Sequence, residues 1–147
     1  MHLRDPHSGS DLGLGQVAEE PQAAGQRADV TPVVATVDLF AGIPVRDYAV
    51  ATAWYERLLG APPSFLPNDT EAVWELAEQR FVYIDVRPEH AGHAMHTVFV
   101  SDFDARISQI AERGLEPVEV ETYDNGVRKA IFFDPDGNEI GFGGGPA

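Results

Sequence analysis

Hydrophobic residues alternate with polar or small ones along the segment VATVDLFAGIPV, residues 34–45. This period-two pattern predicts a strand that buries one of its faces. The residues on its hydrophobic face are Leu39, Ala41, Ile43 and Val45. The next segment, YAVATAWYERLLG, has helical spacing, and Asp47 before it and Gly60 at its end are typical helix caps. The pattern therefore predicts a strand followed by a helix.

Further alternating segments follow this helix. Two strands are predicted at residues 72–77 and 80–86, separated by a polar turn at Glu78 and Gln79, and residues 87–94 are predicted to form a loop. The strand–helix order then recurs, with elements predicted at residues 95–100, 104–114, 117–123, 127–133 and 139–144. The turns DNG and DPDGN separate the last three of these strands.

The two halves of the chain repeat one order of elements. When VRDYAVATAWYERLLGAPP is laid over VSDFDARISQIAERGLEPV, the matching pairs are Val45/Val100, Asp47/Asp102 and Tyr48/Phe103. We interpret residues 31–147 as one domain made of two modules, about residues 36–87 and 94–144. Residues 1–30 contain no aromatic residue and no sustained periodicity, so we expect them to form a disordered tail outside the domain.

The charge and composition of the chain exclude several classes of partner. The 147 residues carry a formal net charge of −14, whereas nucleic acids and anionic membrane surfaces both require a basic footprint. There is no cysteine, so no disulfide framework, thiolate nucleophile or zinc–thiolate site is expected. No apolar run approaches the length of a membrane span, and the amino end lacks the apolar core of a signal peptide, which predicts a cytoplasmic protein.

Three segments carry a resemblance to a known family: IPVRDYAVATAWYERLLG, HTVFVSDFDARISQIAERG and FFDPDGNEIGF. Together they resemble the vicinal-oxygen-chelate superfamily, which includes glyoxalase I, bleomycin-resistance proteins, fosfomycin-resistance enzymes and extradiol dioxygenases. The resemblance covers about residues 36–144 and implies an α+β fold, in which two tandem βαβββ modules form a cupped mixed sheet. It also implies a homodimer, because family members usually cover their sheet edges by pairing. It does not imply one function, because a single fold can carry several.

The resemblance also implies where a metal would lie. Members of the family that use a metal place four ligands, rich in His and Glu, on the first and last strands of each module. The corresponding positions here are Phe40, Asp85, His96 and Gly141. Phe and Gly cannot ligate, and two ligands are fewer than a divalent ion requires. We therefore expect no resident metal or other cofactor, and keep a divalent metal only as an alternative.

Strand alternation extends the site, because residues two apart share a face. If Phe40, Asp85 and His96 face the cup, the predicted ligand-binding residues are Phe40, Trp74, Phe81, Tyr83, Asp85, His96, Val98 and Arg128. Aromatic walls with few polar groups are typical of a small-molecule site. Stacking and cation–π attraction near Asp85 favour an aromatic guest that is neutral or cationic. Anions are expected to bind less well, because they would meet Asp85 and a chain of net charge −14, with Arg128 as the only cation assigned to the cup.

Two classes of function remain at this point. The sequence favours a protein that binds a small organic molecule in the cup without changing it. The alternative is a lyase, isomerase or dioxygenase of the same superfamily, with His96 as general base and Asp85 holding its imidazole, or with a divalent metal. A regulatory or interaction module is a further alternative.

Overall fold

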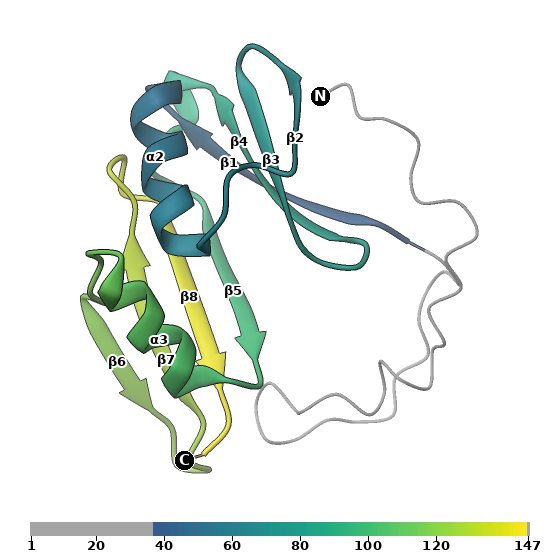
Figure 1. Cartoon of the computed structure of the whole chain (residues 1–147). Coiled ribbons are helices and arrows are strands. Elements are labelled where there is room, and N and C mark those ends of the chain that lie inside the picture. The colour runs from purple at the N-terminus through teal and green to yellow at the C-terminus, as the bar shows by residue number, and fades with distance from the viewer. Residues whose placement is uncertain (1–36, 147) are drawn as a thin grey trace.

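The computed structural model describes residues 37–146, which form two four-stranded mixed sheets and two α-helices (Figure 1). The predicted α+β fold with two strand–helix–three-strand modules is confirmed. The expected disordered tail, residues 1–30, lies outside the described residues. Within the described part, no helix is long and apolar enough to cross a membrane.

Sheet A is formed by the first module and has the strand order β1-β4-β3-β2. Its strands are β1 (Leu39–Val45), β2 (Phe65–Asn68), β3 (Glu71–Ala77) and β4 (Arg80–Val86). Strand β1 runs parallel to β4, and the other neighbours are antiparallel. The sequence patterns do not predict β2, because its four residues, FLPN, are too few to show a period and include a proline.

Sheet B is formed by the second module and repeats this arrangement in the order β5-β8-β7-β6. Its strands are β5 (Met95–Val100), β6 (Glu119–Thr122), β7 (Arg128–Phe133) and β8 (Glu139–Gly144). Strand β5 runs parallel to β8, as β1 does to β4. A short 3₁₀ helix, η1 (Pro88–His90), lies in the segment predicted as a loop between the modules.

Each module contains one α-helix, and an aspartate directly precedes the first residue of each. In α2 (Tyr48–Leu59) the Asp47 carboxylate accepts a hydrogen bond of 2.9 Å from the Val50 amide, as predicted for an N-cap. Gly60 follows the last helical residue, and its φ of 82° is readily adopted only by a residue without a Cβ. In α3 (Phe103–Glu112), Asp102 occupies the N-cap position without a side-chain capping bond.

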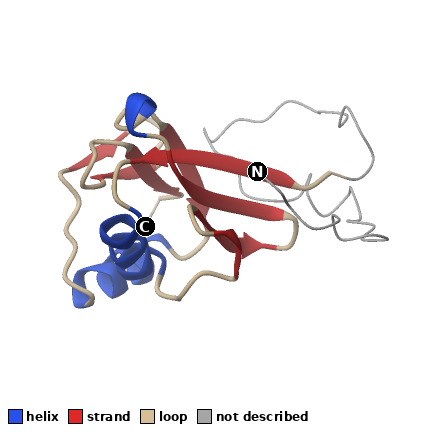
Figure 2. Ribbon diagram, turned by 90° about the horizontal axis from the view of Figure 1, so that it is seen from above, coloured by secondary structure: helices blue, strands red, loops and turns tan. Residues whose placement is uncertain are grey.

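Both helices lie on the same side of the sheets (Figure 2), and their buried faces share one hydrophobic core with the sheets. We call the sheet faces that meet α2 and α3 the inner faces, and the opposite faces the outer faces. The inner faces contribute apolar residues from both modules: Ile43, Val45, Ala72, Trp74, Val82, Ile84, Ala130, Phe132, Ile140 and Phe142. Burial of these side chains is the main stabilising contribution to the fold.

The DPDGN turn of the second module is hydrogen-bonded to the first module. The buried Tyr55 hydroxyl on α2 donates a hydrogen bond of 2.8 Å to the Asp134 carboxylate at the start of this turn. The Asn138 side chain at its end donates to the Asp134 carboxylate and to the Pro44 carbonyl on β1. Buried polar groups are costly unless paired, so this network fixes how the modules pack. The motif is therefore both a turn and a link between the modules.

Candidate functional site

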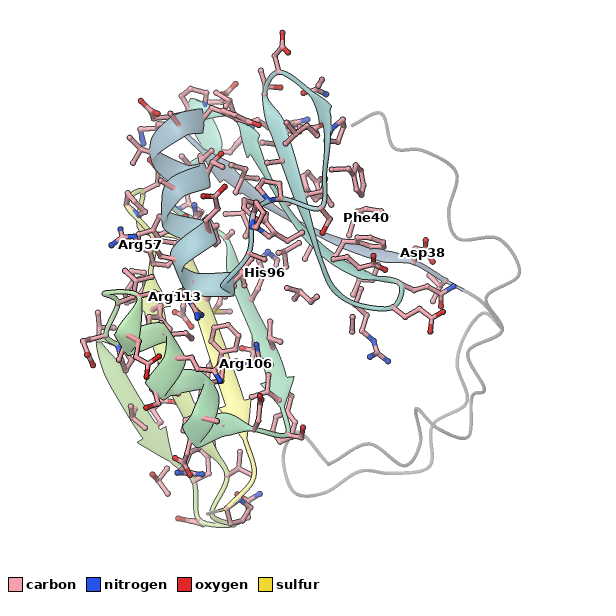
Figure 3. All side chains as sticks on the ribbon, in the orientation of Figure 1. Asp38, Phe40, Arg57, His96, Arg106 and Arg113 are labelled. Carbon is pink, nitrogen blue, oxygen red and sulfur yellow. The ribbon has the colours of Figure 1, made fainter. Side chains whose placement is uncertain are left out.

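The outer face of sheet A brings together half of the predicted ligand-binding residues. Phe40 and Phe81 lie in register on β1 and β4, and their rings are stacked, 4.2 Å apart at an angle of 5°. Tyr83 and Asp85 follow at two-residue intervals on β4 and share the same face. Figure 3 shows Phe40 on the side of sheet A that faces away from sheet B.

Trp74 was expected on this wall, and that placement is wrong. Its neighbour across the strand pair is Val82, and both side chains belong to the inner core. Trp74 is 2% exposed, and its indole N–H donates a hydrogen bond of 2.9 Å to the Ala61 carbonyl. Trp74 therefore packs under α2, where a ligand on the outer face cannot reach it.

His96 and Val98 are also on the other face from the one predicted. They lie beside Ile140 and Phe142 in the β5–β8 register, and these two residues belong to the inner core. The His96 side chain reaches the edge of sheet A (Figure 3), where Nε2 is 3.0 Å from the Gly42 carbonyl oxygen. A carbonyl only accepts, so Nε2 carries the proton in this contact. His96 thus bridges the edges of the two sheets.

The predicted hydrogen bond between His96 and Asp85 is not formed. The Asp85 carboxylate instead accepts a hydrogen bond of 2.8 Å from Nε of Arg87, while His96 donates to Gly42. This hydrogen bond is the main cause of the raised pKa of the Arg87 guanidinium. A general base needs its orienting carboxylate within hydrogen-bond reach, so the arrangement proposed for a metal-free enzyme is absent from these two residues.

The outer face of sheet A is acidic as well as aromatic. Glu71 on β3 lies opposite Asp85, and Glu71 is buried with its carboxylate accepting a hydrogen bond of 2.8 Å from Asn68. Burial raises the pKa of the neighbouring Tyr83 hydroxyl, and the negative charges of Glu71 and Asp85 raise it further. Tyr83 is therefore a neutral hydrogen-bonding group at physiological pH.

A cavity of about 820 Å³ lies against sheet B and the turn between β6 and β7. It is lined by Thr97, Phe99, Thr122, Tyr123, Asp124, Asn125, Val127, Arg128, Lys129 and Gly143. Arg128 is the one predicted ligand-binding residue in this set, so the sequence missed most of the cavity. The volume lies within the range typical of sites for small organic molecules.

Two cations line the cavity, and they differ in how they are held. Arg128 is engaged, because its guanidinium donates to both oxygens of Asp104 at 2.8 and 3.2 Å and lies 4.5 Å from the Phe103 ring centre. Lys129 has a looser partner, with its ammonium nitrogen 3.8 Å from a Glu139 carboxylate oxygen. The lining thus holds two cations and one carboxylate, that of Asp124, whereas the predicted cup is centred on the carboxylate of Asp85.

Comparison with known proteins establishes the family. The family model described as "Glyoxalase/Bleomycin resistance protein/Dioxygenase superfamily" matches residues 35–142, which is most of the chain. The chain belongs to this superfamily. A comparison with curated proteins finds no match.

Solved structures of superfamily members have the same fold. A glyoxalase / bleomycin resistance protein from Catenulispora acidiphila is 57% identical, with a TM-score of 0.73 over 76% of this chain and 100% of that one. A bleomycin-binding protein complexed with bleomycin is 19% identical, with a TM-score of 0.62 over 74% and 98%. A lactoylglutathione lyase from Agrobacterium tumefaciens is 15% identical, with a TM-score of 0.59 over 78% and 96%. At these lower identities the likeness shows the fold alone.

The module duplication changes how the superfamily's metal positions map onto this chain. Val45 matches Val100, so counting back five residues pairs Phe40 with Met95 and leaves His96 paired with Ala41. The same count pairs Gly42 with Thr97. Gly42 is the register partner of Tyr83 and Thr97 is that of Gly141, so Tyr83 is the counterpart of Gly141. The four equivalent outer-face positions are therefore Phe40, Tyr83, Met95 and Gly141, and not His96 and Asp85.

A divalent metal does not fit these residues. None of the four equivalent positions carries an imidazole or a carboxylate, the groups that hold such ions without cysteine. Residues 37–146 contain no group of three or more His, Asp or Glu side chains placed to hold a metal ion. We therefore derive no chemical step through a metal.

Proposed function

We propose that this superfamily member binds a small organic molecule with a flat aromatic portion in the cavity on sheet B and releases it unchanged. The observation that carries the proposal is the cavity itself, whose apolar walls include Phe99, Tyr123 and Val127. Flat rings gain stacking energy on such walls in addition to the burial of apolar area. The exposed polar groups at its edge can fix the orientation of a guest.

Binding without chemical change is favoured over catalysis by the positions of His96 and Asp85. Each has a different partner, Gly42 and Arg87 respectively, and neither lines the cavity. The bleomycin-binding protein of the same fold, complexed with bleomycin, is an example of a superfamily member holding an organic ligand. The expected preference for neutral or cationic guests depends on Asp85, which belongs to sheet A, so it does not describe this cavity.

The test is a titration with 2-naphthamide, a neutral planar probe, followed by calorimetry and by amide chemical shifts. The parent protein should bind it, and the shifts should be largest around Thr97, Phe99 and Gly143. Replacing the stacking ring in Phe99→Leu should weaken binding by roughly 2- to 10-fold. Phe133→Leu, on the same sheet face but outside the cavity, is the matched control and should bind as the parent does. Equal affinities of the Phe99→Leu variant and the parent would contradict the proposal.

The homodimer expected from the sequence remains part of the proposal. Its support is apolar surface on both modules, including Met95 on sheet B and Leu39 and Leu66 on sheet A, all of which are exposed. Sedimentation at micromolar concentration should give twice the chain mass of 16.0 kDa. A stable species with the mass of one chain would contradict it.

A further inference from the structure

Two glycines of β8 leave room on the outer face of sheet B, and two side chains from neighbouring strands occupy that room. A Cβ atom added at Gly141 would lie 2.8 Å from Cε of Lys129, and one added at Gly143 would lie 3.1 Å from Cδ1 of Phe99. The Lys129 stem and the Phe99 ring therefore lie across the backbone of β8. Gly141 is also the position where the superfamily resemblance expects a metal-binding Glu, so a lysine stem takes the space of that ligand.

The strand register places Phe99 and Lys129 on the two strands that flank one glycine, and their side chains lean over β8 from both sides. Phe99 on β5 and Lys129 on β7 are both register partners of Gly143 on the central strand β8. Adjacent strands are about 4.8 Å apart, so the backbones of the two residues are separated by roughly 10 Å, while the ring lies over Gly143 and the lysine stem over Gly141 of the strand between them. Both line the cavity. This arrangement suits a planar molecule that stacks on the Phe99 ring and presents a charged group to the lysine.

Lys129 has hydrogen-bonding capacity left for such a group. Within residues 37–146, the one carboxylate within ion-pair distance of its ammonium is that of Glu139, at 3.8 Å. Both side chains are about one-fifth exposed, so the pair is partly shielded from solvent. An ammonium has three N–H donors, and one loose ion pair does not use them all. Arg128, the other cation of the cavity, already donates to Asp104 and to the Gly145 carbonyl.

From this geometry we infer that Lys129 anchors an anionic oxygen of the ligand while Phe99 stacks on its ring. The cavity then takes a small planar aromatic molecule bearing a carboxylate or phenolate. The inference deepens the proposed function and rests on it. It also replaces the sequence-based expectation that anions bind less well, since that expectation placed the ligand against Asp85 on sheet A and did not consider Lys129. The protein's own ammonium provides the positive charge that meets the ligand oxygen.

The test compares 2-naphthoate with 2-naphthamide, which have the same ring and differ in charge. The parent should bind the naphthoate roughly 5- to 10-fold more tightly at low salt, as expected for a partly shielded charged hydrogen bond. Lys129→Met keeps the length of the stem and removes the charge, so it should reduce this ratio to about one. Lys129→Arg should retain a ratio above one, because the charge is kept.

Glu139→Gln provides a second variant whose effect has the opposite sign. It removes the carboxylate that competes for the Lys129 ammonium, so it should raise the affinity for naphthoate and leave that for naphthamide unchanged. Raising the salt concentration should weaken naphthoate binding selectively.

Two results would overturn the inference and can be told apart. If naphthamide binds but the parent shows no preference for naphthoate, or Lys129→Met keeps the preference, the anion anchor is wrong and the proposed function stands. If neither probe binds the parent, both the inference and the proposed function fail.

Discussion

The two sheets carry opposite charges at the same place in the repeated module. Glu71 lies opposite Asp85 in sheet A, and Lys129 lies opposite Gly143 at the equivalent positions of sheet B. The outer face of sheet A is aromatic and acidic, with Phe40 stacked on Phe81. The outer face of sheet B has glycines at its centre and a lysine above them. One backbone plan therefore presents two chemically different surfaces.

The inner faces differ much less than the outer ones. Equivalent pairs on these faces are apolar in both modules: Ala72/Ala130, Trp74/Phe132, Val82/Ile140 and Ile84/Phe142. These residues pack beneath α2 and α3, where close packing restricts both volume and polarity. The comparison indicates that the inner faces determine the fold and that the outer faces are where ligand chemistry can vary.

The largest effect is expected on the free energy of unfolding, when an inner-face residue is replaced and compared with its outer-face neighbour. Phe132 is 1% exposed and Phe133 is 46% exposed, although they are consecutive on β7. Phe132→Ala should lower the free energy of unfolding by about 3–5 kcal/mol, because it leaves a cavity in the core. Phe133→Ala should lower it by less than about 1 kcal/mol. Urea denaturation of both variants measures the difference, and equal losses would contradict the assignment of the faces.

The link between the modules should give the next largest effect. Asp134→Ala removes a carboxylate that accepts from Tyr55 and from the Asn138 side chain. Leaving these buried donors unpaired should cost about 3 kcal/mol of unfolding free energy. Asp69→Ala, in an exposed turn, is the matched control and should cost less than about 0.5 kcal/mol. A loss at Asp134 as small as at Asp69 would show that the network does not hold the modules together.

A smaller effect is expected from pH, acting through Tyr55. Burial, together with the charge and hydrogen bond of Asp134, raises the pKa of this hydroxyl above its ordinary value of 10.0. The unfolded state therefore loses the proton first, and the contribution of Tyr55 to stability is constant at lower pH and falls above about pH 10. The slope should approach about 1.4 kcal/mol per pH unit.

Tyr55→Phe removes this titration and should flatten the decline, at a cost of about 1 kcal/mol near neutral pH. Urea denaturation of the parent and the variant at a series of pH values provides the measurement. Identical slopes above pH 10 would mean that Tyr55 is not held in its neutral form by the fold.

Much of the fold was predictable because its signals are local. The β1 alternation, the Asp47 cap, the Gly60 terminus and the repeated order of elements depend on residues close in sequence. The grouping of Phe40 with Phe81, Tyr83 and Asp85 also holds, since it needs only the two-residue period and the pairing of β1 with β4.

The errors at the site have separate physical causes. Strand β3 has an irregularity between Glu75 and Ala77, and a shift of one residue moves a side chain such as Trp74 to the other face. For His96 the signal was present, because the Val45/Val100 match pairs it with Ala41 on the inner face. The cavity had no local signal, because Phe99 and Lys129 meet only through their common register with Gly143.

The most direct test of where this protein binds its ligand is to locate a bound planar molecule by intermolecular nuclear Overhauser effects. The protein is labelled and saturated with 2-naphthoate, and contacts from the ring protons are assigned to side chains. Binding in the cavity on sheet B predicts contacts to Thr97, Phe99, Tyr123 and Val127, which line that cavity. Contacts confined to Phe40, Phe81 and Tyr83 on the outer face of sheet A would contradict it.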